Sequence, residues 1–242
     1  MPLSDLLTYQ LGNCWRIVET QEVAATREIT DNADEQSRLE ALLDASKPSA
    51  PDDCHGLSYL LMTPFRYPPL QYGSRFGSTW ERGIFYGAAE LDTAFAEAAV
   101  YFWLFQQGPI TLGPLSCIRD QRTAFSVRIA SAKALDLRSA YFKDKIDSIM
   151  DPKSWVVSQQ LGKEIRETEA EFFWYPSARQ DTGTNVAVLT PDAFSTREPD
   201  QYQHWQVRLD EETCWFGRAG ATSIEFEKSR FLIDGRIPHP CL

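Results

Sequence analysis

Hydrophobic and polar residues alternate with a period of two in several stretches of the chain, as they do in strands that bury one face. Phe125, Val127 and Ile129 follow this rule, with polar neighbours between them. Short apolar stretches rich in aromatic and β-branched residues recur through the second half of the chain and predict further strands. The expected strands are residues 14–18, 83–88, 125–129, 134–137, 172–175, 185–189, 205–209, 213–216 and 223–226.

Apolar residues with helical spacing indicate two helical stretches beside these strands. Residues 91–106 predict one helix, with Asp92 as a candidate N-cap. Residues 139–169 predict a second stretch that is interrupted at Asp151 and Pro152, because proline does not fit the interior of a helix. The apolar side of the first helix is expected to carry Leu91, Phe95, Ala98, Phe102 and Phe105.

An acidic segment, residues 21–53, precedes the mixed region and is expected to be largely helical, with Asp31 as a candidate cap. A loop rich in proline, serine and aspartate ends it at residues 46–54. Its helical spacing is carried by Ile29, Leu39, Leu42 and Leu43. We therefore predict a single domain over residues 1–242 that includes this segment as an N-terminal helical arm.

The order of the elements favours an α+β fold. Helices and strands are mixed in the first half and strands dominate the second, which fits an α+β domain better than repeating βαβ units. No GxGxxG sequence follows a strand, so the fingerprint of a Rossmann dinucleotide site is absent. A dinucleotide bound by this chain would need another kind of fold.

Charge and composition exclude several classes of function. The chain has 24 basic and 34 acidic residues and a net charge of −10, whereas binding to a nucleic-acid backbone normally requires positive charge. The five cysteines are scattered without a CxxC pair, so neither a metal site nor a disulfide framework is expected. No signal peptide and no stretch of eighteen apolar residues occurs. These features predict a cytoplasmic protein that binds neither membrane nor nucleic acid directly.

Three residues at regular distances form the candidate site. Arg75, Tyr86 and Glu97 are each eleven residues apart, in a glycine-rich loop, a predicted strand and a predicted helix. A guanidinium, an aromatic ring and a carboxylate suit an anionic, planar, glycosidic ligand such as NAD. Gly73 would let the backbone approach such a ligand closely.

This block resembles the RES domain, the toxin half of bacterial toxin–antitoxin pairs. The family pattern has a G-x-R-aromatic loop, a strand tyrosine and a T-A-x-x-E helix start, which here are residues 73–76, Tyr86 and residues 93–97. Later P-S-x-R and N-x-A-V elements match residues 176–179 and 185–188, and an early W-R pair matches residues 15–16. The resemblance makes Ser177 the candidate serine and spans roughly residues 14–226. The acidic arm is longer than in compact family members.

The resemblance implies a fold similar to ADP-ribosyltransferases and NAD as the substrate, with no metal. It also implies hydrolysis, phosphorolysis or transfer of ADP-ribose as the outcome, toxicity through NAD⁺ loss, and inhibition by a cognate Xre-type helix-turn-helix antitoxin in a hetero-oligomer.

The residue types support that chemistry independently of the family resemblance. Loss of nicotinamide from ribose passes through a cation that a carboxylate stabilises, and Glu97 is the candidate for this role. Arg75 would hold the diphosphate and Tyr86 would offer its ring to nicotinamide. Ser177 and Asn185 would contribute polar contacts, and Arg16, Arg66 and Arg179 are further phosphate candidates.

Two alternatives share part of this reasoning. Mono-ADP-ribosylation of a specific protein would use the same residues and differ only in the acceptor. A non-catalytic interaction module would keep the scaffold without turnover and is suggested by the acidic arm. His55 and His239 are expected to be solvated surface residues, and Trp80 is a candidate gate of the pocket.

Overall fold

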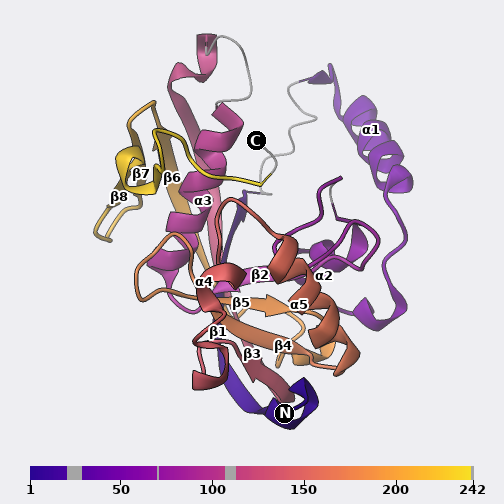
Figure 1. Ribbon diagram of the computed structural model, residues 1–242. Helices are drawn as coiled ribbons and strands as arrows, with labels where there is room; N and C mark the ends of the chain where they lie inside the picture. Colours follow the sequence, from indigo (N-terminus) through magenta and orange to yellow (C-terminus); the bar gives the residue numbers. More distant parts are fainter. Residues whose placement is uncertain (21–28, 70, 107–112, 241–242) are drawn as a thin grey trace.

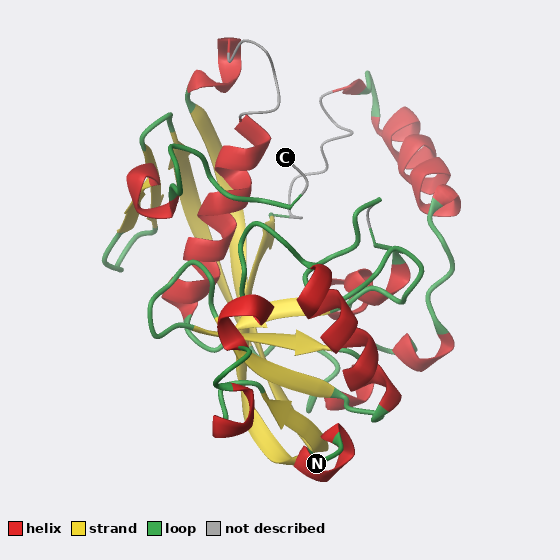
Figure 2. Cartoon of the chain, viewed as in Figure 1, coloured by secondary structure: helices red, strands yellow, loops and turns green. Residues whose placement is uncertain are grey.

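The computed structural model describes residues 1–20, 29–69, 71–106 and 113–240 and shows a mixed sheet flanked by helices (Figures 1 and 2). Within these residues eight strands pair in the order β1-β2-β5-β4-β3-β6-β7-β8. The strands are β1 (Thr8–Glu19), β2 (Phe85–Ala88), β3 (Ile118–Asp136), β4 (Phe172–Pro176), β5 (Thr184–Val188), β6 (Gln201–Leu209), β7 (Thr213–Gly217) and β8 (Ile224–Glu227). The helices are α1 (Ala33–Ser46), α2 (Tyr59–Arg66), α3 (Leu91–Gln106), α4 (Ile146–Ile149) and α5 (Val156–Glu167). The predicted α+β class and the N-terminal helical arm are confirmed.

Strand β3 joins two parts of the sheet. One edge of β3 pairs with β1 from Thr8↔Ala134 to Glu19↔Arg122, and its other edge pairs first with β6 and then, in parallel, with β4. Because β1 also pairs with β2, at Trp15↔Ala88, the strands β1-β2-β5-β4-β3 close into a ring, and β6, β7 and β8 extend from it. The two strands expected at 125–129 and 134–137 are one, since the ladder with β1 continues between them.

Three hydrophobic clusters fill the spaces around the sheet. The first lies between the ring strands and α2, around Phe85, Phe125 and Trp174. A second packs α3 against β6 and β7, and a third packs α4 and α5 against the other face of β4 and β5. Burial of each such aromatic side chain stabilises the fold by roughly 1.5–3 kcal/mol. The clusters therefore fix where α3 and α5 lie relative to the strand ends.

Helix α3 has the predicted bounds, and its predicted apolar side is buried only in part. Phe95 and Trp103 are fully buried, whereas Phe105, which was expected on the buried side, is 68% exposed. Asp92 lies inside the first turn and is not the cap; Glu90 precedes the helix, and its carboxylate accepts hydrogen bonds from Thr93 Oγ1 and the Thr184 N–H. The helix is apolar almost all round, so its periodicity alone does not identify the buried side.

The N-terminal arm stands apart from the sheet (Figure 1). No residue of α1 is buried, and residues 21–28 of the expected acidic helix lie outside the described part of the chain. The N-cap is Asn32 rather than Asp31, because the Asn32 Oδ1 accepts the Glu35 N–H at 2.9 Å. None of the described helices has the length and apolar character needed to span a bilayer.

A tight turn at residues 73–77 fits between α5 and β2. The Ser74 N–H donates to the Gly77 carbonyl at 2.8 Å, and Phe76 at the turn is fully buried. A Cβ atom at Gly162 of α5 would lie 2.0 Å from the Phe76 carbonyl oxygen. Only a glycine at position 162 therefore allows the turn to approach the helix this closely.

Replacement of this glycine tests the contact. Alanine in a helix interior normally stabilises by about 1 kcal/mol relative to glycine, but the clash at position 162 should make Gly162→Ala destabilising by about 1–3 kcal/mol. Urea unfolding measures the difference. The exposed neighbour provides the control, since Lys163→Ala should change stability by less than about 0.5 kcal/mol. A Gly162→Ala protein more stable than the parent would show that the turn does not press on α5.

Candidate active site

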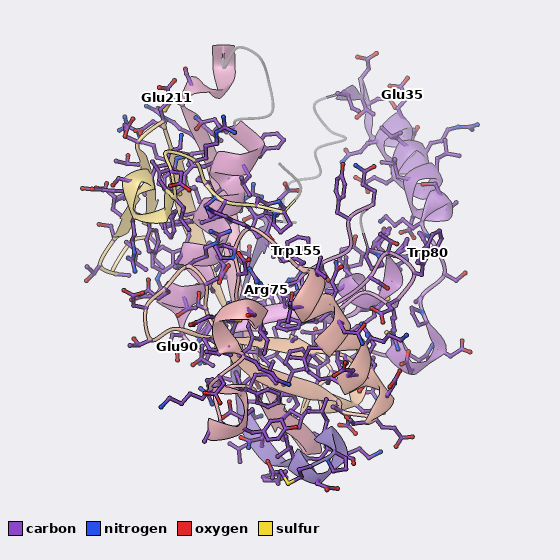
Figure 3. The ribbon with its side chains drawn as sticks, viewed as in Figure 1. Glu35, Arg75, Trp80, Glu90, Trp155 and Glu211 are labelled. Carbon is purple, nitrogen blue, oxygen red and sulfur yellow. The ribbon has the colours of Figure 1, made fainter. Side chains whose placement is uncertain are left out.

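A cleft of about 900 Å³ lies where α3, β1, β2, the 73–77 turn and Trp155, the residue before α5, meet. Arg75 and Trp155, both lining residues, are close together in the centre of Figure 3. The helix contributes Glu97, Tyr101 and Phe105 to the lining, at the spacing of successive helical turns. This size is in the upper part of the range for small-molecule sites.

The Glu97 carboxylate is held by two donors at one oxygen. Ser177 Oγ and Asn185 Nδ2 each donate to Glu97 Oε1 at 2.7 Å. Asn185 is only 4% exposed, and its Oδ1 has no partner among the described residues. No hydrogen bond to Glu97 Oε2 is formed within the described chain, so this oxygen is the one available to a ligand in the cleft.

Ser177 orients the Glu97 carboxylate from a position outside the cleft lining. Its Oγ accepts the N–H groups of Arg179 and Gln180, both at 3.1 Å, which leaves the hydroxyl proton for Glu97. The turn is closed by the Ser177 N–H, which donates to the Gly183 carbonyl at 2.8 Å. Ser177 is not among the residues that line the cleft, so it touches the carboxylate rather than the space a ligand would fill.

Tyr86 connects β2 to the 73–77 turn. Its hydroxyl accepts the Phe76 N–H at 3.1 Å and shares a hydrogen bond with Ser74 Oγ at 2.9 Å. Burial raises the pKa of Tyr86 to about 12, so the phenol is neutral throughout the physiological range. The ring lines the cleft while the hydroxyl holds the turn that carries Arg75.

Three arginines line the cleft without carboxylate partners. All three donate to backbone carbonyls instead. Arg16 donates to Tyr86, Arg75 to Ile149 and Asp151, and Arg179 to Pro238. Within the part of the chain that the structure describes, none of the three forms an ion pair shorter than 4.0 Å. In a chain with an excess of acidic residues, uncompensated cations in a cleft are complementary to an anionic ligand.

Arg66 and Trp80 lie outside this group. Arg66 donates to the Pro48 carbonyl and does not line the cleft. Trp80 is 95% exposed and lies well to one side of Arg75 and Trp155 (Figure 3), so the expected gate is not at the pocket. Gly73 does line the cleft, with φ +73°, and a Cβ there would lie 2.2 Å from the Gly77 carbonyl oxygen.

His239 corrects another expectation. It is not a solvated surface residue but lies in the cleft wall, edge-on to Trp155 and Tyr101 with ring centroids 5.0 and 5.9 Å apart. No local motif marks His239 or Trp155, because their contact joins positions more than eighty residues apart. Tyr101 was detectable in principle, since it follows Glu97 by four residues on a predicted helix.

The charges and side-chain types that line the cleft indicate an organic anion as its ligand. A carboxylate lies among arginines and aromatic rings, which suits a sugar phosphate joined to a flat ring. Among the described residues no group of three His, Cys, Asp or Glu side chains is arranged to hold a metal ion.

Comparisons with known proteins identify a family and similar solved structures. The model of the RES domain matches residues 50–210, which include Arg75, Tyr86, Glu97, Ser177 and Asn185. The solved MbcT-MbcA toxin-antitoxin complex of M. tuberculosis contains a chain with 13% identity and a TM-score of 0.46; the match covers 84% of this chain and 86% of that one. No curated protein shows significant similarity to the sequence.

The Tyr86 hydroxyl provides a test of how the turn is held. Tyr86→Phe keeps the ring but leaves the buried Phe76 N–H without its acceptor, so unfolding should become easier by about 1–3 kcal/mol. Chemical denaturation measures this loss. Tyr9→Phe, at a largely exposed tyrosine, should leave stability unchanged and is the matched control. Equal stabilities of the two variants would contradict the proposed support of the turn.

Proposed function

The chain belongs to the RES domain family, and we propose that it is a toxin that consumes NAD⁺ by cleaving the bond between nicotinamide and ribose. The observation that carries this proposal is the Glu97 carboxylate, fixed by Ser177 and Asn185 and facing an arginine-lined cleft. Family membership supports the class of activity, and the geometry supports the assignment of individual residues.

The proposed reaction breaks the bond between C1′ of ribose and the nicotinamide nitrogen. The bonding electron pair stays with the ring nitrogen, so nicotinamide leaves as a neutral molecule and positive charge develops on the ribose. A carboxylate close to C1′ stabilises that cation more than it stabilises the bound substrate, which lowers the barrier. Glu97 Oε2 takes this role, because Oε1 already accepts two hydrogen bonds.

The cationic side of the cleft would bind the rest of the substrate. Arg75, on the 73–77 turn, offers donors to the diphosphate oxygens, and Arg16 and Arg179 add positive charge nearby. Asn185 has a buried acceptor oxygen without a partner among the described residues, which suits a ribose hydroxyl or the carboxamide of nicotinamide. Tyr86 presents its ring to the same space.

The acceptor of ADP-ribose distinguishes three versions of the reaction. Water gives free ADP-ribose, inorganic phosphate gives its phosphate ester, and a protein nucleophile gives a covalent adduct. Incubation with adenine-labelled NAD⁺, in phosphate and in phosphate-free buffer, separates them by where the label is found. Our proposal expects small-molecule products, whereas label fixed on a protein would favour mono-ADP-ribosylation.

We further propose that an antitoxin of the Xre helix-turn-helix type binds this protein and blocks the cleft. Family membership supports this partner. Co-expression of such an antitoxin with this chain should yield a hetero-oligomer that releases no nicotinamide.

Neutralising the carboxylate tests the assignment of Glu97. Glu97→Gln keeps the shape and the acceptor for Ser177 and Asn185 but removes the negative charge, so nicotinamide release should fall at least about a hundredfold. The rate is measured by chromatography of nicotinamide, with thermal unfolding as the check on folding. The exposed Glu211→Gln is the matched control. A Glu97→Gln enzyme with the parent rate would remove this residue from the chemistry.

Two arginines provide a paired test of substrate binding. Arg75→Ala should raise the KM for NAD⁺ by about tenfold to a hundredfold, because a charge-assisted contact to phosphate is lost. Arg66→Ala removes the same charge outside the cleft and should leave KM unchanged. Steady-state kinetics of both variants give the answer, and similar KM increases in the two would indicate a general charge effect instead of a diphosphate contact.

A further inference from the structure

The end of the described chain returns to the cleft after β8. Arg179 Nη2 donates to the Pro238 carbonyl at 2.9 Å, and Lys153 Nζ pairs with Asp234 at 3.0 Å. Ile237 and Pro238 are buried. The chain is therefore held beside the cleft at residues 237–239, and His239 itself lines the cleft, although these residues lie outside the range 50–210 of the family match.

His239 lies between two helices at this wall. Its ring meets Trp155, which precedes the first residue of α5, at an interplanar angle of 77°, and Tyr101 of α3 at 79°. Trp155 is 9% exposed, and its Nε1 has no acceptor among the described residues. The imidazole thus shares a small space with a buried N–H donor and the tyrosine one turn beyond Glu97.

The charges around His239 are positive. Burial lowers the pKa of His239, and Arg179 and Arg75 lower it further, so the ring is neutral at pH 7 and keeps one N–H donor and one acceptor. Neither arginine has an ion-pair partner within 4.0 Å in the described residues. Two guanidinium groups and an imidazole that face one region are complementary to a group with several anionic oxygens.

We propose that His239 is a substrate-binding residue, which together with Arg75 and Arg179 binds the diphosphate of NAD⁺. This inference rests on the proposed function. Tyr101, which His239 contacts, follows Glu97 by one helical turn, about 6 Å along α3. A ribose at Glu97 would therefore place its attached diphosphate near the imidazole. The residue would give the enzyme its preference for a dinucleotide over a riboside that lacks phosphate.

Substrates with and without the diphosphate test this assignment. His239→Ala should raise the KM for NAD⁺ about tenfold while kcat changes less than about twofold, because a contact made equally in the ground and transition states is lost. The same substitution should leave kcat/KM for nicotinamide riboside unchanged. His239→Gln keeps a donor and an acceptor and should recover most of the affinity. His55→Ala, at an exposed histidine outside the cleft, is the matched control.

Binding of ADP-ribose, measured by calorimetry, separates this proposal from the proposed function. If the intact protein releases no nicotinamide, the proposed reaction fails, but weaker binding of ADP-ribose to His239→Ala than to His55→Ala still supports the contact. Equal losses with NAD⁺ and nicotinamide riboside would show that His239 only maintains the fold. An unchanged KM for NAD⁺, or no ADP-ribose binding by the intact protein, would also overturn the proposal.

Discussion

The site depends on one carboxylate oxygen that receives two hydrogen bonds. Glu97 comes from α3, whereas Ser177 directly follows β4 and Asn185 lies in β5, so the contact exists only if helix and strands are correctly placed. The antiparallel register of Tyr175 with Asn185 brings the two donors to the same end of these strands. The packing of α3 on β6 and β7 fixes where Glu97 lies relative to the sheet. The large aromatic core thus determines the position of a single side chain.

The cleft keeps opposite charges close without pairing them. Arg179 and Glu97 influence one another electrostatically, yet they form no ion pair, since the guanidinium is tied to the Pro238 carbonyl and the carboxylate to Ser177 and Asn185. Arg75 is likewise tied to carbonyls that precede α5. Had these groups paired, a substrate would have to break a salt bridge before it could bind. Neutral partners leave both charges available to a molecule that carries an anion and develops a cation.

The sequence was most informative where local pattern and local structure coincide. Short aromatic and β-branched stretches located β4 to β8, and the bounds of α3 were predicted correctly, because each depends on neighbours within one element. The buried side of α3 was predicted only in part: Phe95 and Phe105 were both expected on it, but Phe95 packs against Phe216 of β7 whereas Phe105 is exposed. Family motifs pointed to Glu97 and Ser177 but not to their direct hydrogen bond. His239 reaches the cleft through tertiary contacts that no motif records.

The residues of the site fall into two groups, one inside the range matched by the family and one outside it. The range matched by the family supplies Glu97, Asn185, Arg75 and Arg179 to the lining and Ser177 as a donor to the carboxylate. These are the residues to which we assign cleavage of the glycosidic bond and binding of the diphosphate. Arg16 on β1 and His239 near the end of the chain come from outside that range and reach the same cleft. In the proposed reaction the carboxylate beside C1′ must keep one geometry, since the charge it stabilises has a fixed position. Contacts to more distant parts of a substrate tolerate variation, so flanking segments are where members of such a family can differ in the molecule they select.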